Sequence, residues 1–217
     1  MPDPVKTTRR YDSPRRREQA EATRTQILEA AGRLFERQGY GPTTMAAIAR
    51  EAGVALKTVY VAFETKSGLL RELWHLLVRG GAGNAPVQDR DWFREVLDEP
   101  GPRRQLELNA RNSRAVKERA AGLLAVLRGA APSDPEIAEL WARIQTDFYE
   151  NQRAIVQSLD AKHALRSDLD VPRATDLLWT LNHPDVWHLL VGERGWSADD
   201  YERWFADTAC AQLLRPV

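Results

Sequence analysis

The chain has 217 residues, in which 31 Lys and Arg balance 31 Asp and Glu. A chain of this length can bury a full core without disulfides or metals, and its one cysteine, Cys210, excludes an internal disulfide. No run of about 18 apolar residues occurs and the basic, polar start is unlike a signal peptide, so we expect a cytoplasmic protein of one or two domains.

Charge is unevenly distributed along the chain. Residues 1–79 contain 14 Lys and Arg against 9 Asp and Glu, whereas residues 80–217 contain 17 against 22. This asymmetry indicates that only the first part meets a polyanion. An Arg-rich segment can equally be a solvated tail, so charge alone leaves the partner open.

The first 80 residues have the pattern of a tail followed by four helices. Residues 1–18 are Arg-rich without apolar periodicity, which predicts a disordered basic arm. Apolar residues recur at helical spacing over 19–38, and helices over 45–51, over 56–63 and from Lys66 onward are predicted next. Stop and cap residues separate them, namely Gly39, Thr43-Thr44 and Gly53.

The rest of the chain is also predicted to be helical. A Gly-rich stretch near residue 81 predicts a boundary between domains over 19–80 and 81–217, and residues 84–103, with three prolines, show no clear element. Helices are predicted over 104–127, from a cap at Ser133 to about residue 159, over 172–192 with an interruption at Pro184, and from a cap at Ser197 to 214. No strand-like alternation is sustained, so the predicted fold class is all-α.

The segment from Thr43 to Leu70 is the most informative part of the sequence. Its two short helices are joined by a turn that contains Gly53. Glycine suits this turn, because the turn needs a backbone conformation that other residues resist. Val59 and Phe63 can close a small core behind the turn. Two crossing helices joined in this way form a helix-turn-helix, which places its second helix in the major groove of DNA.

This segment resembles the DNA-binding domain of the TetR family of bacterial repressors over about residues 20–70. The matching residues are Leu34-Phe35, Gly39-Tyr40, Thr43-Thr44, Ile48-Ala49, Ala52-Gly53-Val54, Thr58, Val59-Tyr60, Phe63, Lys66 and Leu69-Leu70. Ala55 departs from the family pattern because serine is common there, and Ala62 departs because an aromatic residue or histidine is common there. The resemblance implies an N-terminal three-helix helix-turn-helix domain and a C-terminal helical bundle that binds a ligand and dimerises.

Eight residues are predicted to contact DNA: Thr43, Thr44, Ala55, Lys57, Thr58, Tyr60, Val61 and Lys66. By position, Thr44 lies at a helix N-terminus where a phosphate can bind. Lys57, Thr58 and Val61 lie on the face of the second helix that we expect to be exposed toward phosphates and base edges. The resemblance implies phosphate contacts for Tyr60 and Lys66.

Several of these residues have a structural alternative. Tyr60 can pack in the core, Lys57 can be simply solvated, and Thr43 can only cap a helix. The arm residues Arg15, Arg16 and Arg17 either enter a neighbouring minor groove or attract DNA diffusely.

The resemblance implies that the second domain binds a small-molecule effector and forms the homodimer. Candidates to line the pocket are aromatic residues for which core packing is the alternative: Trp92, Trp141, Phe148, Trp179 and Trp187. Candidates for a two-fold interface lie on the last two long helices, and some of them must face their own core: Leu177, Leu181, Trp204, Phe205 and Leu213.

No metal, cofactor or catalytic site is predicted. His75, His163, His183 and His188 show no helical spacing with a second metal ligand, and no phosphate loop or nucleophile elbow occurs. An enzyme is therefore not expected. The leading prediction is a homodimeric, sequence-specific repressor that a small-molecule effector releases from a near-palindromic DNA operator. The alternative is an effector-independent regulator or activator.

Overall fold

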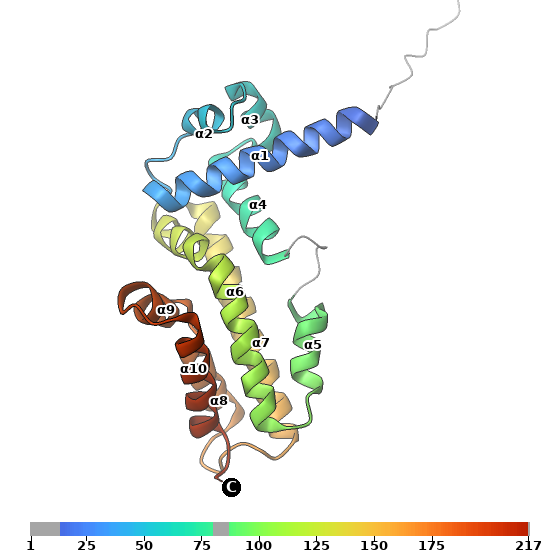
Figure 1. Ribbon diagram of the computed structural model, residues 1–217, viewed down its shortest axis with the longest axis vertical. Helices are drawn as coiled ribbons and strands as arrows, with labels where there is room; N and C mark the ends of the chain where they lie inside the picture. Colours follow the sequence, from blue (N-terminus) through green and yellow to red (C-terminus); the bar gives the residue numbers. More distant parts are fainter. Residues whose placement is uncertain (1–13, 80–86, 217) are drawn as a thin grey trace, which may run out of the picture.

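The computed structural model describes residues 14–79 and 87–216, and this part of the chain is built from helices (Figure 1). Its one pairing of β type, among these described residues, is an isolated bridge between Leu165 and Leu214. The predicted all-α fold is confirmed.

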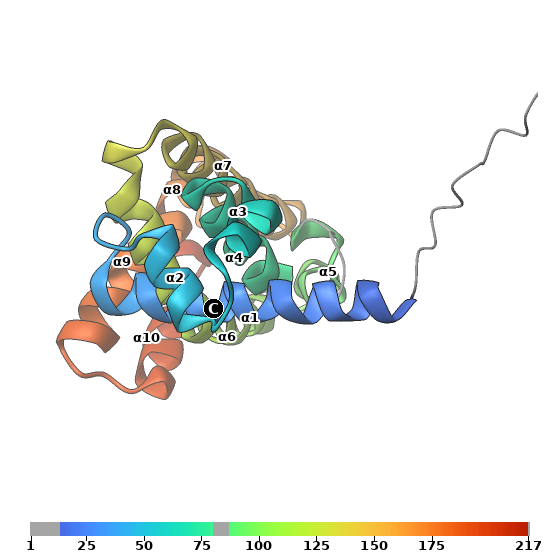
Figure 2. The ribbon, with the colours of Figure 1, turned by 90° about the horizontal axis from the view of Figure 1, so that it is seen from above.

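Four helices form one end of the molecule: α1 (Pro14–Gln38), α2 (Met45–Glu51), α3 (Leu56–Phe63) and α4 (Lys66–Arg79). Figure 2 views the molecule from this end, with α1 extending to one side beyond the other helices. α2 and α3 have the predicted bounds. α1 begins at Pro14, because proline is well tolerated in the first turn of a helix, so residues 14–18 are not part of a disordered arm. The rest of the predicted arm lies outside the described residues.

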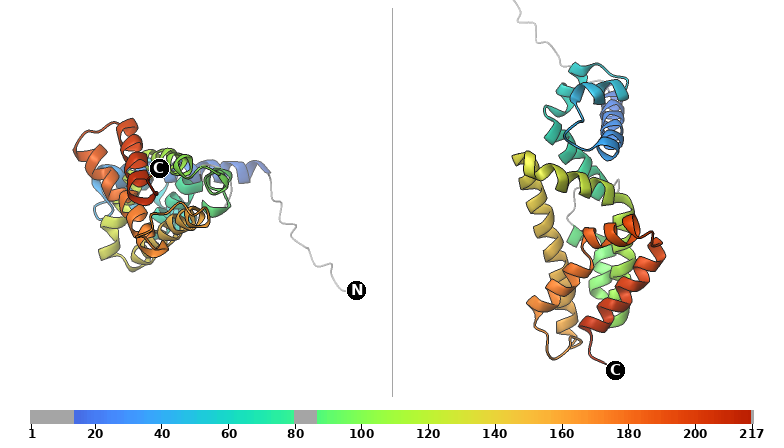
Figure 3. Two further views of the ribbon diagram at one scale, coloured as in Figure 1. Left: turned by 90° about the horizontal axis from the view of Figure 1, so that it is seen from below. Right: turned by 90° about the vertical axis from the view of Figure 1, so that its left-hand side faces the viewer.

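The remaining helices follow in the order η1 (Val87–Asp89), α5 (Asp91–Asp98), α6 (Pro102–Ala130), η2 (Ala131–Ser133), α7 (Pro135–Ala161), α8 (Val171–Leu181), α9 (Pro184–Trp187), η3 (His188–Glu193) and α10 (Ala198–Leu213). α6 and α7 run along the long axis of the molecule, with α5 on one side and α8 and α10 on the other. α10 ends far from α2 and α3, at the opposite end of the molecule (Figure 3).

Helix starts follow the local capping chemistry. Asp170 and Ser197 cap α8 and α10, and Pro184 separates α8 from α9, as predicted. The cap of α7 is Asp134 and not Ser133, because Pro135 occupies the first helical position and makes its neighbour the cap. α5 was not predicted, since eight residues between prolines give little periodicity.

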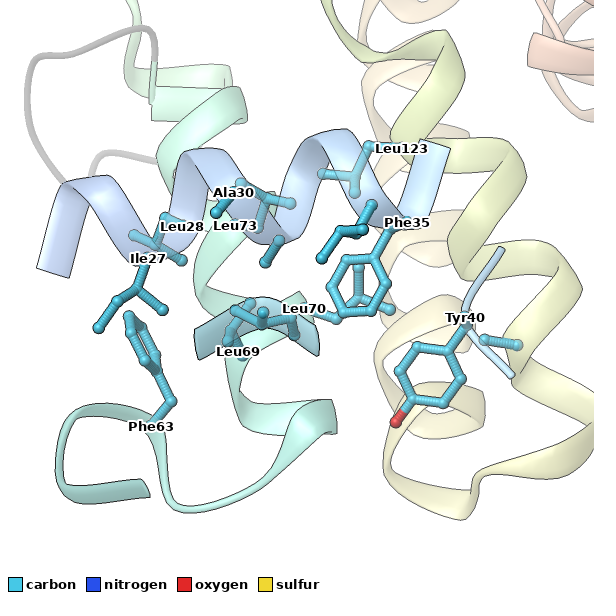
Figure 4. Close-up of a cluster of buried hydrophobic side chains, with 14 of the residues drawn as sticks. Ile27, Leu28, Ala30, Phe35, Tyr40, Phe63, Leu69, Leu70, Leu73 and Leu123 are labelled. Atoms are coloured by element: carbon cyan, nitrogen blue, oxygen red, sulfur yellow. The ribbon is translucent and has the colours of Figure 1, made fainter. Parts of the chain in front are cut away.

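Two hydrophobic clusters stabilise the molecule. The front cluster comprises the buried apolar residues of α1–α4 with those of α6 from Ala120 onward and of α7 up to Ile144. Figure 4 shows part of it, with Ile27 and Phe35 of α1 facing Leu69 and Leu70 of α4. The rear cluster comprises buried residues of α5, α8, α9 and α10 with those of the first half of α6 and second half of α7.

α6 and α7 thus belong to both clusters and connect them. The boundary predicted near residue 81 falls outside the described residues, so the division into domains over 19–80 and 81–217 stays a prediction.

Candidate nucleic-acid interface

The turn between α2 and α3 follows from the residues around it. The Thr44 hydroxyl caps α2 by accepting a hydrogen bond from the Ala47 amide at 3.1 Å. Gly53 has a φ of +66°, in the left-handed region that favours glycine. The Val54 amide then donates to the Ala49 carbonyl at 3.0 Å. These contacts close the helix-turn-helix that the sequence predicted.

α1 holds both helices of this motif in place. Gln26 Nε2 donates to the Ala52 carbonyl, at the end of α2, at 2.8 Å. Arg24 Nη1 donates to the Ala62 carbonyl of α3 at 2.6 Å, and its guanidinium lies 4.3 Å from the centre of the Phe63 ring. Because both helices are tied to one long helix, the outer face of α3 has a fixed orientation.

The outer face of α3 exposes apolar side chains that a protein usually buries. Leu56, Tyr60 and Val61 have exposed fractions of 41%, 47% and 76%, and they are three of the five large hydrophobic residues exposed in the described chain. The side chain of Lys57 is exposed beside them. Tyr60 is therefore not a core residue, and α3 presents a mixed apolar and cationic surface to whatever lies outside it.

The other residues predicted to contact DNA have different surroundings. Ala55 and Thr44 are exposed, and Thr58 is half-buried. Thr43 is fully buried, and its hydroxyl donates to the Gly39 carbonyl at 2.8 Å and accepts from Gln38 Nε2 at 3.1 Å. The Thr43 side chain is thus committed inside the protein, and we do not retain it as a DNA contact.

The ammonium group of Lys66 also has partners within the protein. Its Nζ donates to the Tyr40 carbonyl at 2.9 Å and to the Gly41 carbonyl at 3.4 Å, and it lies 4.0 Å from the centre of the Tyr40 ring. Burial lowers the pKa of the Lys66 ammonium, although nearby Asp134 opposes the shift. Lys66 therefore fixes the loop before α2, whatever else its third N–H group binds.

A polar joint connects the end of the molecule that carries α2 and α3 to the first turn of α7. The Tyr40 hydroxyl donates to Asp134 at 2.6 Å, and the Ser67 hydroxyl donates to Glu136 at 2.8 Å. Burial, followed by the hydrogen bond to Asp134, raises the Tyr40 pKa well above its usual value. Since Asp134 also caps α7, these hydrogen bonds link the start of α7 to the loop before α2 and to the start of α4.

The aromatic residues predicted to line a pocket do not form one group. Phe148 and Trp179 both lie against the His183 ring, at centroid distances of 6.3 and 4.8 Å. Trp187 is buried in the rear cluster, whereas Trp141 packs on the front cluster. Trp92 lies on α5, edge-on to its neighbour in the chain. The structure therefore brings together two of the five.

The predicted dimer residues divide into two classes. Phe205 and Leu213 are fully buried in the rear cluster, so they belong to the core of their own chain and cannot form a surface. Leu177, Leu181 and Trp204 are only partly buried. Sequence could not separate the two classes, because α8 and α10 carry apolar residues on more than one side.

Two surface depressions lie near these helices. One, of about 500 Å³, is lined by residues of α7 and α8 that include Tyr149, Arg153 and Thr175, and none of the five predicted aromatic residues lines it. The other, of about 320 Å³, is lined by Trp196, Asp200 and Trp204.

Sequence analysis missed a polar stripe on α6. Gln105, Asn109, Ser113 and Lys117 recur every four residues, and all but the half-buried Ser113 are buried in the rear part of the molecule. The indication was present in the sequence, since residues four apart share a helix face. The sequence pattern does not reveal the burial, because polar side chains in a helix usually face solvent.

The described residues offer neither a metal site nor a membrane span. Over 14–79 and 87–216, no three His, Cys, Asp or Glu side chains gather closely enough to hold a metal ion. No helix in those ranges combines the length and apolar character needed to cross a bilayer.

The front part of the chain matches a known family. Residues 27–73 match the model of the tetR family of bacterial regulatory proteins. Over 163 residues the chain is 29% identical to the protein of Pseudomonas putida named "Probable HTH-type transcriptional regulator ArpR", an alignment that covers 74% of this chain and 76% of that protein.

Solved structures share the whole architecture. NalD of Pseudomonas aeruginosa, the secondary repressor of the MexAB-OprM multidrug efflux pump, matches with a TM-score of 0.71 at 24% identity, covering 92% of this chain and 100% of NalD. The SmeT–triclosan complex matches with a TM-score of 0.66 at 18% identity, covering 89% of this chain and 92% of SmeT. At these identities the matches show a shared fold.

Proposed function

We propose that this chain, whose residues 27–73 match the tetR family of bacterial regulatory proteins, is a homodimeric transcriptional repressor of that family and not an enzyme. In this proposal it acts in the bacterial cytoplasm, binds a near-palindromic operator, and leaves that operator when a small-molecule effector binds. NalD is named as a repressor and SmeT was solved with triclosan, which supports the two halves of the proposal.

The exposed face of α3 is the observation that carries the proposal. Leu56, Tyr60 and Val61 are apolar or aromatic and face outward, which suits contact with thymine methyl groups and sugars in a major groove. Lys57 on the same face can donate to guanine or to a phosphate. The Thr44 cap and the N-terminus of α2 suit a flanking phosphate.

Two copies of α3 are required for a near-palindromic site. Their separation must match about 34–36 Å, one turn of DNA, or a multiple of it. We assign the two-fold contact to α8 and α10, whose partly exposed Leu177, Leu181 and Trp204 provide apolar area beyond the rear cluster.

Effector release follows from the polar joint of Tyr40 with Asp134 and of Ser67 with Glu136. An effector that favours a different position of α7 displaces these contacts. The pair of α3 helices then adopts a separation that no longer fits the operator, and the population shifts to DNA-free protein.

The test is selection of bound duplexes from a random pool by the full chain, followed by titration of the selected duplex. We expect two inverted half-sites. Lys57→Ala should change the preferred base at one position of each half-site, because removal of a base contact relaxes specificity there. The control Arg143→Ala, at an exposed position of α7, should select the wild-type site. Recovery of no enriched sequence, or of a single half-site bound by a monomer, would contradict the proposal.

A further inference from the structure

The buried stripe on α6 ends at a lysine whose charge has no counter-charge. Lys117 is 4% exposed, and no ion pair among the described residues includes it. Its Nζ donates to Ser113 Oγ at 2.6 Å and to Asn182 Oδ1. Burial without an acidic neighbour lowers the pKa of the Lys117 ammonium to about 7. An ammonium group has three N–H donors, so one remains after these two bonds.

Among the described residues, the direct contacts of this ammonium group are with neutral acceptors and aromatic faces, and its charge also acts on the nearby His183 ring. Asn182 Nδ2 donates onward to Gln152 Oε1 at 3.2 Å, while its carbonyl oxygen accepts from both Lys117 and Ser113. The centres of the Tyr201 and Phe205 rings lie 5.3 and 5.9 Å from Lys117 Nζ. Ring faces attract a cation weakly, but they do not replace a carboxylate. A buried cation of this kind is costly unless an anion joins it.

Further donors of the same region also lack an acceptor. In the described chain, four buried side-chain atoms have no hydrogen-bond partner: Gln105 Nε2, Asn109 Nδ2, Trp179 Nε1 and the Tyr201 hydroxyl. All four can donate, and each lies on α6, α8 or α10. Buried polar groups are nearly always paired in folded proteins. The unpaired Tyr201 hydroxyl, on a ring that faces the buried Lys117 ammonium group, therefore indicates a missing acceptor there.

One of these donors belongs to a residue that contacts Lys117, and another lies on α8 about one helical turn before Asn182. Tyr201 presents its ring to the ammonium group, and Trp179 precedes Asn182, a ligand of that group, by three residues on α8. Tyr201 also contacts Trp204, at a centroid distance of 5.8 Å, and Trp204 lines the open depression of about 320 Å³. An aromatic layer therefore connects the charged centre with a depression at the surface.

We propose that the effector of this chain is an organic anion with an apolar body, and that Lys117 binds its carboxylate or equivalent acidic group. The Tyr201 hydroxyl and the Trp179 indole N–H donate to the same ligand, while the aromatic residues of α10 pack against its body. The effector role rests on the proposed function, whereas binding of the anion can be measured without DNA.

The test compares three organic acids, namely benzoate, 2-naphthoate and decanoate, each with its own neutral primary amide. Each is titrated into the full chain by calorimetry at pH 6.5. We expect at least one acid to bind at least about tenfold more tightly than its amide, since a charge-assisted hydrogen bond is lost in the amide. Equal affinity, or absence of binding, across all three pairs would overturn the proposal.

Variants then locate the anion. Lys117→Met should bring the acid to the affinity of its amide, and Tyr201→Phe, which removes one unpaired oxygen, should weaken the acid several-fold while leaving the fold intact. The control Arg111→Met removes a cation from the exposed face of the same helix and should keep the wild-type preference. Retention of that preference in Lys117→Met would overturn the assignment.

Operator affinity separates this inference from the proposed function. The preferred acid should weaken binding of the selected operator by wild type and leave Lys117→Met unaffected. If an operator is selected but no acid is preferred, this inference fails alone. If an acid is preferred but no operator is selected, the repressor proposal fails and the anion site stands.

Discussion

In the front cluster, Tyr40 donates to Asp134 and Lys66 donates to two backbone carbonyls, so the polar groups at its edge are matched. In the rear cluster, Lys117 has no carboxylate partner among the described residues, and Tyr201 has no partner for its hydroxyl. The comparison indicates that the polar groups beside the front cluster already have their hydrogen-bond partners within the chain. The rear part retains unpaired donors that a ligand can satisfy, at a cost in stability while no ligand is bound.

The largest effect expected from this division is on DNA binding through the outer face of α3. Val61→Glu places an anion on a side chain that is 76% exposed, so affinity for the selected operator should fall by about 100-fold or more because like charges repel. The free energy of unfolding should change by less than about 0.5 kcal/mol, since the site is on the surface.

Fluorescence anisotropy with labelled operator and urea unfolding measure the two effects. Ala142→Glu, at an exposed position of α7, is the matched control and should bind DNA with wild-type affinity. An equal loss of affinity in both variants would show that the change of net charge, and not the face of α3, is responsible.

The next largest effect is a gain in stability in the rear part. Lys117→Met replaces a buried cation with an apolar side chain of similar length, so the free energy of unfolding should rise by about 1–3 kcal/mol at pH 7. Urea unfolding checks the value. A decrease would mean that Lys117 and Asn182 form a stabilising pair, and the contrast between the two clusters would be lost.

The gain in stability of Lys117→Met over wild type should also depend on pH. The Lys117 pKa is about 7 in the folded chain and about 10.4 when unfolded, so the unfolded state binds more protons between these values. Wild-type stability therefore rises with pH through this window, and the advantage of Lys117→Met is largest at pH 7 and below and shrinks toward pH 10. Burial lowers the His183 pKa and raises the Tyr201 pKa, so both shifts move these groups away from the window in which Lys117 titrates. A difference in free energy of unfolding between Lys117→Met and wild type that does not vary with pH would contradict this expectation.

A smaller effect is expected at the joint between the front part and α7. Tyr40→Phe removes the hydroxyl that donates to Asp134, so the free energy of unfolding should fall by about 1.5 kcal/mol, as for a hydrogen bond to a charged group. The response of operator affinity to effector should also decrease. Tyr149→Phe, which removes a 3.2 Å contact to exposed Asp176 on α8, is the control. A full effector response in Tyr40→Phe would exclude the joint from the coupling.

The smallest effect is expected for Lys66, the front counterpart of Lys117. Lys66→Met removes donors to the Tyr40 and Gly41 carbonyls, so stability should fall by about 1 kcal/mol, opposite in sign to Lys117→Met. If the third N–H group of Lys66 also binds a phosphate, the slope of log affinity against log salt concentration should become shallower by about one. A gain in stability at Lys66 would remove the distinction between the two clusters.

The sequence predicted the front part better than the rear part for a physical reason. The bounds of α2 and α3 follow from local chemistry, in which Thr44 caps a helix and Gly53 permits a left-handed turn. Such features depend on neighbours in the chain, so a single sequence is enough to identify them.

The rear part depends on contacts between distant helices. Whether Phe205 faces the core and Trp204 the surface is decided by how α10 packs on α6 and α8, which local periodicity does not determine. The buried state of Lys117 was missed for the same reason, because a lysine in a helix is nearly always solvated. Unusual burial of a polar residue becomes visible only once the helices are placed.

The most direct test of the account is whether the outer face of α3 touches operator bases. Val61→p-benzoylphenylalanine places a photoreactive ketone at that face, and irradiation with the selected duplex should attach the chain to bases within each half-site. The same residue at Ala142 should give no DNA adduct. Crosslinks confined to the protein, or distributed over flanking DNA without regard to the half-sites, would contradict the account.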